Sequence, residues 1–166
     1  MFKNLFQKKQ KVTEERVLAP INGKIVEIDQ VPDPTFAQKM LGDGLAIIPV
    51  DGSITAPIDG EIVQLFPTKH AIGIRGNSGL ELLIHIGLET VSMNGEGFTA
   101  HVQQGQKVKA GDLLIDVDLD QVKEKAADTI TPIVITNMDA VESIEKQTAA
   151  KASSGETEIM FIKMKK

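Results

Sequence analysis

The residues best suited to chemistry in this chain of 166 residues are two histidines in the stretch Phe66–Glu89. His70 and His85 each belong to an apolar run, and the Gly-Asn-Ser-Gly segment at 76–79 separates the two runs. Because Gly and Asn tolerate the backbone angles of tight turns, this segment predicts a β-hairpin. A turn centred in it pairs residues whose numbers sum to 155, as 70 and 85 do. The predicted register places the imidazoles opposite each other, with Cβ atoms roughly 4.5–5.5 Å apart. An odd loop would separate them onto opposite faces.

A histidine pair can support two kinds of chemistry. One imidazole nitrogen can attack a phosphoryl group and carry it covalently, while the other histidine becomes cationic and stabilises the added negative charge. Alternatively, both histidines and a carboxylate can bind zinc, with Asp33 and Glu89 as the nearest candidates for a third ligand and a general base. Thr68 lies two residues before His70, on the same predicted strand face, where its hydroxyl suits holding one imidazole tautomer. The residues alone leave both chemistries open.

Composition and missing motifs exclude several other functions. The chain has no Cys, no G-x-S-x-G and no G-x-x-x-x-G-K-[ST], which argues against disulfides, thiol or serine hydrolysis and nucleotide hydrolysis. A net charge of −5 and the absence of Trp and Tyr argue against nucleic acid as a partner. The third histidine, His101, lies in a polar alternating stretch and is interpreted as a surface residue.

The elements that must position the histidine pair are predicted to be short antiparallel strands. The pattern A-P-I-x-G-x-I-V begins at Ala19 and recurs at Ala56, and Gly-acid-Gly segments at 42–44 and 95–97 each precede an alternating stretch. Such echoes suggest duplicated hairpin units around a shared core. With regular Gly and Pro turns and no long amphipathic helix, the sequence predicts an all-β fold, an antiparallel sandwich or barrel.

One or two short helices interrupt this pattern. Residues 33–42 have an Asp N-cap, Pro at the first helical position and Gly just past the end, and 120–127 form a second short helix. Residues 130–136 are predicted to be a strand, and Pro132 suggests either a sheet edge or a strand start, because Pro cannot donate to a ladder. Residues 137–151 are interpreted as a loop and 156–163 as the last strand.

The chain is expected to form a single domain over residues 17–166, preceded by a flexible tail over residues 1–16. Phe2, Leu5 and Phe6 share helical spacing, so a short amphipathic turn resting on a membrane is an alternative. A solvated terminus is favoured, because one helical turn is weak alone. No signal peptide or membrane-spanning stretch is evident, which favours a cytoplasmic location.

Four stretches resemble a known family: 18–23 (LAPING), 68–71 (TKHA), 82–91 (LLIHIGLETV) and 94–98 (NGEGF). They are similar to the glucose-type IIA component of the bacterial phosphoenolpyruvate:sugar phosphotransferase system, and the resemblance runs from about Val17 to the C-terminus. It implies a cytoplasmic β-sandwich that takes a phosphoryl group from the histidine-containing phosphocarrier protein. The group then passes to the IIB cysteine of a glucose-type sugar permease, and no cofactor is expected.

The resemblance also implies roles for individual residues. His85 would be the phosphohistidine, His70 would stabilise the phosphoryl group and Thr68 would orient His70. The more apolar strand around His85, and the room left by Gly87, independently favour His85 as the nucleophile. An apolar rim for partner docking would comprise Phe36, Met40, Leu41, Phe66, Leu83 and Val91. Asp33 matches a family acid near the site, whereas Glu89 departs from the Asp common at its position.

Two other functions remain as alternatives. A zinc hydrolase lacks a convincing third ligand, although zinc at His70 and His85 could be adventitious or regulatory. A carrier domain with a covalently attached prosthetic group is suggested by the turn at 105–113, but no Lys there is flanked by Met. If the protein is a phosphotransferase component, we expect a monomer that contacts the membrane only through the permease. The alternative is direct membrane contact by an amphipathic turn in the N-terminal tail.

Overall fold

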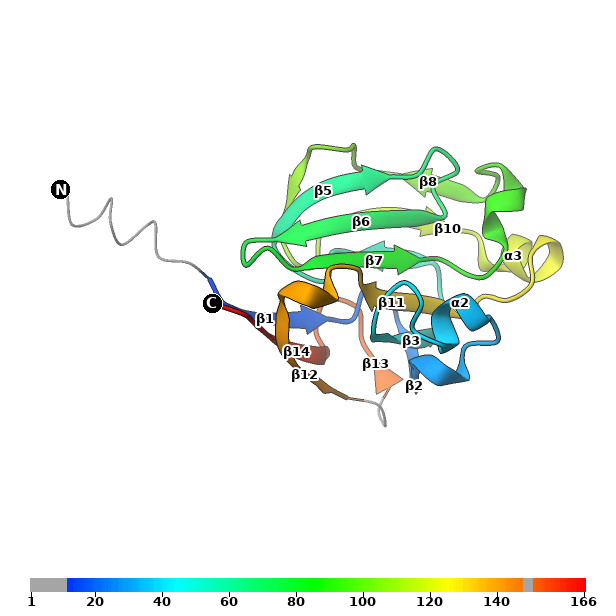
Figure 1. Cartoon of the computed structure of the whole chain (residues 1–166). Helices are drawn as coiled ribbons and strands as arrows, with labels where there is room; N and C mark the ends of the chain where they lie inside the picture. The colour runs from blue at the N-terminus through cyan, green and yellow to red at the C-terminus, as the bar shows by residue number, and fades with distance from the viewer. Residues whose placement is uncertain (1–11, 148–150) are drawn as a thin grey trace.

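An eight-stranded antiparallel sheet contains the hairpin that joins His70 to His85 (Figure 1). The computed structural model describes residues 12–147 and 151–166. In spatial order the strands are β13 (Lys151–Ala152), β2 (Gly23–Glu27), β3 (Gly44–Pro49), β11 (Thr131–Ile135), β7 (Glu81–His85), β6 (Ala71–Gly76), β5 (Gly60–Leu65) and β9 (Lys107–Val108). The hairpin of β6 and β7 is therefore flanked by β5 on one side and β11 on the other.

Two three-stranded sheets complete the fold. One contains β1 (Glu14–Leu18), β14 (Glu158–Met164) and β12 (Val141–Lys146), and the other contains β4 (Ser53–Thr55), β10 (Leu113–Val117) and β8 (Phe98–Ala100). The helical segments are η1 (Ile28–Gln30), α2 (Pro34–Ala37), η2 (Thr90–Met93), α3 (Leu119–Lys125) and η3 (Met138–Ala140). The predicted antiparallel all-β fold with two short helices is confirmed.

The two faces of the large sheet bury different residues. Because strand side chains alternate, Ile84 of β7 points into a core shared with both small sheets, including Val17 and Ile115. Leu83 points the other way and packs against a smaller cluster beneath η1 and α2, with members Val26, Ile28, Val31, Phe36, Ala46, Leu88, Ile130 and Val134. His85 shares the face of Leu83, so the small cluster lies beside the histidine site.

The repeated A-P-I-x-G segments form matching turns that bond to each other. The N–H of Leu18 donates to the carbonyl of Pro57 at 2.9 Å, and the N–H of Thr55 donates to the carbonyl of Pro20 at 2.7 Å. Each turn therefore satisfies a backbone group of the other at equivalent positions. This reciprocity supports the predicted duplication of hairpin units.

The first helix is shorter than predicted. The carboxylate of Asp33 accepts from the N–H of Thr35 and caps α2, as expected, but the helix ends at Ala37 rather than continuing to Gly42. Lys39 adopts φ of 59°, a left-handed conformation that no α-helix can continue through. The second helix, α3, begins at Leu119 with Asp118 as its N-cap.

Of the two positions predicted for Pro132, the sheet edge is wrong, whereas the strand start is confirmed. β11 begins at Thr131 and lies between β3 and β7, in the interior of the large sheet. Pro132 pairs with Ala46 of β3, but the pairing with β7 begins only at Ile133. A proline is tolerated at this point because it lies near the strand start, where the pairing with β7 has not yet begun.

Two further boundaries differ from the sequence analysis. The predicted loop 137–151 contains η3, β12 and the start of β13, and β12 escaped notice because a register shift between Val141 and Ser143 breaks the alternation. β1 begins at Glu14, within the predicted tail, where it pairs with Lys163 of β14. The rest of that tail, residues 1–11, lies outside the described residues, as does the amphipathic turn considered for it.

Candidate active site

The hairpin that carries the histidines has a three-residue turn. β6 and β7 pair Ala71 with His85 and Arg75 with Glu81, and the N–H of Gly76 donates to the carbonyl of Leu80. The loop is therefore 77–79, with its last residue, a glycine, at φ of 92°. The predicted register, which paired His70 with His85 directly, is wrong by one residue.

The two imidazoles nevertheless meet. Their ring centroids lie 5.1 Å apart with an interplanar angle of 79°. His70 precedes the first residue of β6 and follows Lys69, whose φ of 60° departs from the extended backbone of a strand. The carbonyl of His70 still accepts from the N–H of Ile86 at 2.7 Å, so the backbone stays in register while the side chain leaves the regular pleat. A local turn thus restores the pair that an odd loop would otherwise separate.

His85 is held through its Nδ1 atom. The Nδ1–H donates to the carbonyl of Gly87 at 2.7 Å, which leaves Nε2 with the free lone pair. Gly87 has φ of 71°, and a Cβ there would lie 2.8 Å from the carbonyl oxygen of Asp128 and 2.8 Å from Cγ2 of Thr90. Only glycine therefore fits both the conformation and the space, and the position of its carbonyl is fixed by close packing.

His70 is held in the same way by a side chain. Its Nδ1 shares a short hydrogen bond with the Thr68 hydroxyl, and the Phe66 ring lies 5.4 Å from its own ring at an edge-on angle. His70 is only 5% exposed. Burial, and then the nearby His85, lower the pKa of His70 to about 4. At neutral pH the imidazole is uncharged, with Nε2 as the ring nitrogen not engaged by Thr68.

The electrostatic surroundings also keep His85 neutral. Burial lowers the pKa of His85, while the hydrogen bond to the Gly87 carbonyl and the Asp33 carboxylate act in the opposite direction. A neutral imidazole has a lone pair available for attack, and the nearby carboxylate favours the positive charge that the ring gains when Nε2 forms a bond. The arrangement therefore suits nucleophilic catalysis by Nε2.

The six predicted docking residues differ in solvent exposure, and all except Phe36 are exposed or half-buried. Met40, Val91 and Leu41 are exposed, at 69%, 55% and 41% respectively, and Phe66 and Leu83 are half-buried. In contrast, Phe36 is only 4% exposed, and its ring centroid lies 5.0 Å from that of His85. Phe36 therefore lies beneath the rim rather than on it.

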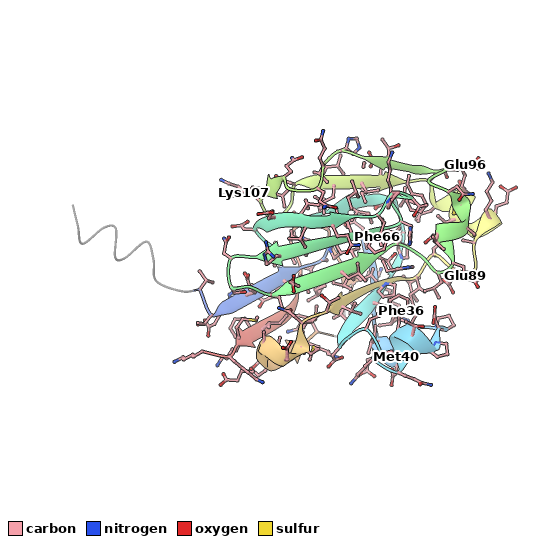
Figure 2. All side chains as sticks on the ribbon, turned by 45° about the horizontal axis from the view of Figure 1, so that its top comes forward. Phe36, Met40, Phe66, Glu89, Glu96 and Lys107 are labelled. Atoms are coloured by element: carbon pink, nitrogen blue, oxygen red, sulfur yellow. The ribbon has the colours of Figure 1, made fainter. Side chains whose placement is uncertain are left out.

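The rim surrounds the histidine end of the sheet. Figure 2 shows Phe36, Met40, Phe66 and Glu89 on the same side of the molecule, and β7 ends near α2 in Figure 1. Asp33 is half-buried and Glu89 is exposed, with φ of 60°. Apolar side chains bordered by carboxylates are typical of a surface that docks partners transiently.

The described residues offer little support for zinc. No group of three or more His, Cys, Asp and Glu side chains in 12–147 and 151–166 is placed to hold a metal ion. Neither Asp33 nor Glu89 thus completes a site with the histidines. His101 is exposed, as expected, and lies 2.8 Å from Asp116.

Two site features escaped the sequence analysis. The carbonyl of Gly87 as partner of His85 is a backbone contact, and side-chain patterns do not reveal it. The residue type of Gly87 indicates room beside His85, but its positive φ, which sets the direction of its carbonyl, is visible only in the structure. The contact of Phe36 with His85 joins residues far apart in sequence and had no local signal.

Comparison with known proteins agrees with this geometry. Residues 15–141 match the family described as phosphoenolpyruvate-dependent sugar phosphotransferase system, EIIA 1. The chain belongs to this family. It is a phosphotransfer component that acts through a histidine.

Similar proteins cover almost the whole chain. The chain is 57% identical to the glucose-specific EIIA component of Halalkalibacterium halodurans, over 99% of both chains. It is 58% identical to the corresponding protein of Bacillus cereus, over 99% of this chain and all of that one. A solved structure, glucose permease IIA from Mycoplasma capricolum, superposes with a TM-score of 0.78 at 40% identity, over 90% of this chain and 96% of that one.

Among the described residues, no helix is long and apolar enough to cross a membrane.

Proposed function

We propose that this EIIA protein carries a phosphoryl group on Nε2 of His85. The histidine-containing phosphocarrier protein supplies the group, and the cysteine of a IIB domain receives it. The glucose-specific relatives support a glucose-type permease as the destination. One cytoplasmic domain, which begins with β1 at Glu14, carries this activity, and the protein works as a monomer. The observation that carries the proposal is the histidine pair, in which each Nδ1 is hydrogen-bonded and neither Nε2 has a hydrogen-bond partner among the described residues.

The first transfer uses the lone pair of His85 Nε2. As Nε2 forms a bond to phosphorus, the bond from phosphorus to the donor histidine breaks, and its electron pair returns to the donor nitrogen. The ring keeps its Nδ1 proton, held by the Gly87 carbonyl, and therefore becomes a phosphorylated imidazolium. In the second transfer, the IIB thiolate attacks phosphorus and the electron pair of the P–N bond returns to Nε2. A protonated ring leaves as a neutral imidazole, which makes this step easier.

His70 stabilises the charge that arrives with the phosphoryl group. A dianionic group beside His70 raises the pKa of that imidazole from about 4, because the opposite charge favours the cation. The Thr68 hydroxyl holds Nδ1, so Nε2–H is the donor available for a phosphoryl oxygen. Such donation also stabilises the oxygens of the transferring group in the transition state, where phosphoryl-transfer catalysis mostly lies.

The exposed rim around the pair supplies the docking surface. Met40, Leu41 and Val91 offer apolar area, and Asp33 and Glu89 offer carboxylates for a basic partner surface. Apolar contact contributes affinity, while the charges increase the rate of encounter and select partners. A modest, reversible interface suits a carrier that must leave one partner before it meets the next.

The experiment is phosphate mapping after incubation with phosphoenolpyruvate and the two general phosphotransferase proteins. We expect one acid-labile phosphoryl group on the wild-type chain, none on His85→Ala, and one on His70→Ala that passes onward at least about 100-fold more slowly. His101→Ala is the control and should match the wild type. Phosphorylation of His85→Ala with none on His70→Ala would reverse the two roles.

A further inference from the structure

Phe36 differs from every other residue assigned to the docking rim. It is 4% exposed, whereas Met40, four residues later, is 69% exposed. Sequence spacing predicts one shared helix face for these two side chains, but α2 ends at Ala37 and Met40 lies beyond it. A partner protein that touches Met40 thus finds almost none of the Phe36 surface. The contact that Phe36 does make is with the ring of His85.

Phe36 is held rigidly against that ring. The Asp33 carboxylate caps α2 through the N–H of Thr35 at 2.9 Å, and Pro34 fixes the first helical residue. The Phe36 side chain packs within the small cluster over the sheet, next to Leu83. Its ring centroid lies 5.0 Å from that of His85 at an interplanar angle of 57°. The aromatic wall is therefore part of the buried structure and does not depend on a bound partner.

Three contacts together confine the His85 imidazole. The Gly87 carbonyl holds Nδ1, His70 lies edge-on to the ring at 5.1 Å, and Phe36 closes a further side. Of these three contacts, the one with Phe36 alone involves a purely apolar side chain, since Gly87 contacts the ring through its carbonyl and His70 has ring nitrogens. It restricts rotation of the ring and occupies space that water would otherwise take.

We propose that Phe36 is a positioning residue that fixes the His85 ring and shields the phosphohistidine from water, rather than a docking residue. This inference rests on the proposed function, since it requires the phosphoryl group on His85. The reaction that Phe36 suppresses is hydrolysis. The oxygen of water forms a bond to phosphorus, the P–Nε2 bond breaks, and its electron pair returns to Nε2. The imidazolium becomes neutral imidazole, and the protons of water leave with inorganic phosphate or pass to solvent.

The test compares Phe36→Leu and Phe36→Ala with Met40→Ala as the matched control. Each variant is phosphorylated, purified away from its donor and followed for loss of phosphate. We expect hydrolysis about tenfold faster in Phe36→Leu, faster still in Phe36→Ala, and unchanged in Met40→Ala. Phe36→Leu keeps an apolar side chain in the cluster, so the comparison stands even if Phe36→Ala does not fold.

Two further readouts separate positioning from docking. In transfer assays, Phe36→Leu should lower kcat with little change in the KM for the phosphocarrier, whereas Met40→Ala should raise KM. The ¹⁵N NMR signals of His85 should show that Phe36→Leu partly loses the single Nδ1–H tautomer. A raised KM with wild-type hydrolysis, or no change in any readout, would overturn this inference alone. Phosphate mapped to a residue other than His85 would overturn the proposed function with it.

Discussion

The two histidines differ in the group that is hydrogen-bonded to each Nδ1 atom. A backbone carbonyl, from Gly87, accepts from Nδ1–H of His85 and keeps that proton in place before and after phosphorylation. A hydroxyl, from Thr68, can either donate to Nδ1 of His70 or accept from it, so His70 can change its protonation state without losing its partner. The fixed ring suits the nucleophile, and the adaptable ring suits the group that responds to the phosphoryl charge.

The low pKa of His70 makes the stability of the unphosphorylated protein sensitive to acid. The unfolded chain takes up a proton on this histidine near pH 6.5, but the folded chain does so only near pH 4. The unfolded state therefore binds more protons between these values, and the free energy of unfolding falls as the pH drops through this window. The contribution amounts to about 3 kcal/mol at pH 4 relative to pH 7.

Urea unfolding at pH 7 and pH 4 checks this prediction. His70→Gln should lose about 3 kcal/mol less of its unfolding free energy than the wild type does over the same change. His101→Gln replaces an exposed histidine and should behave as the wild type. Equal losses in the wild type and His70→Gln would show that His70 titrates normally in the folded protein.

Among the elements, α2 influences the site through its cap as well as its side chains. Asp33 holds the helix that carries Phe36, and its charge raises the pKa of His85. Asn caps helices about as well as Asp but is uncharged. Asp33→Asn should therefore lower the pKa of His85 while leaving α2 intact, and Asp33→Ala should in addition cost about 1 kcal/mol of stability. NMR titration of His85 with urea unfolding measures both, and a wild-type pKa in both variants would contradict the assignment.

The segment after β7 is equally specific, because it turns at a left-handed glycine. Gly87→Ala places a Cβ 2.8 Å from the Asp128 carbonyl oxygen, in addition to the strain of φ at 71°. We expect a loss of about 3 kcal/mol in unfolding free energy and displacement of the carbonyl that holds His85.

Gly79→Ala is the matched control for that substitution. Gly79 also has positive φ, but a Cβ there meets no atom within 4 Å. It should cost about 1 kcal/mol and leave phosphoryl transfer unchanged. Denaturant unfolding and transfer assays on both variants provide the measurement. Equal losses in the two variants would mean that packing around Gly87 contributes nothing beyond backbone strain.

These elements also show how far the sequence could predict the structure. The A-P-I-x-G turns and the alternating strands are local patterns, and they led to the correct fold class. The turn at 77–79 has three residues, whereas the predicted register required an even number, and this length depends on Gly79 adopting positive φ rather than on periodicity. The meeting of His70 and His85 was predicted correctly from an incorrect register, and the Lys69 turn explains the difference. The burial of Phe36 depends on where α2 stops, which propensity does not determine.

For the whole molecule, His85 is the last residue of β7 in the large sheet, and the histidine pair lies against Phe36 and Phe66, which Figure 2 labels. The net charge of −5 and the carboxylates around the docking rim favour basic partners.

Val91→Lys places a positive charge on the docking surface, where it repels a basic partner. The substitution leaves the core unchanged, since Val91 is 55% exposed. It should raise the KM for the phosphocarrier about tenfold and change stability by less than about 0.5 kcal/mol. Steady-state transfer rates and thermal unfolding test this, and an unchanged KM would place the docking surface elsewhere.

The proposed mechanism depends most directly on which nitrogen carries the phosphoryl group, and NMR can identify that nitrogen. Protein labelled with ¹⁵N at histidine, phosphorylated through the phosphocarrier and examined by ¹⁵N and ³¹P NMR, resolves both the residue and the ring position. We expect a phosphorus–nitrogen coupling at Nε2 of His85, a protonated Nδ1 on the same ring, and a raised pKa for His70. Phosphate on Nδ1 of His85, or on either nitrogen of His70, would contradict the proposed role of His85 Nε2.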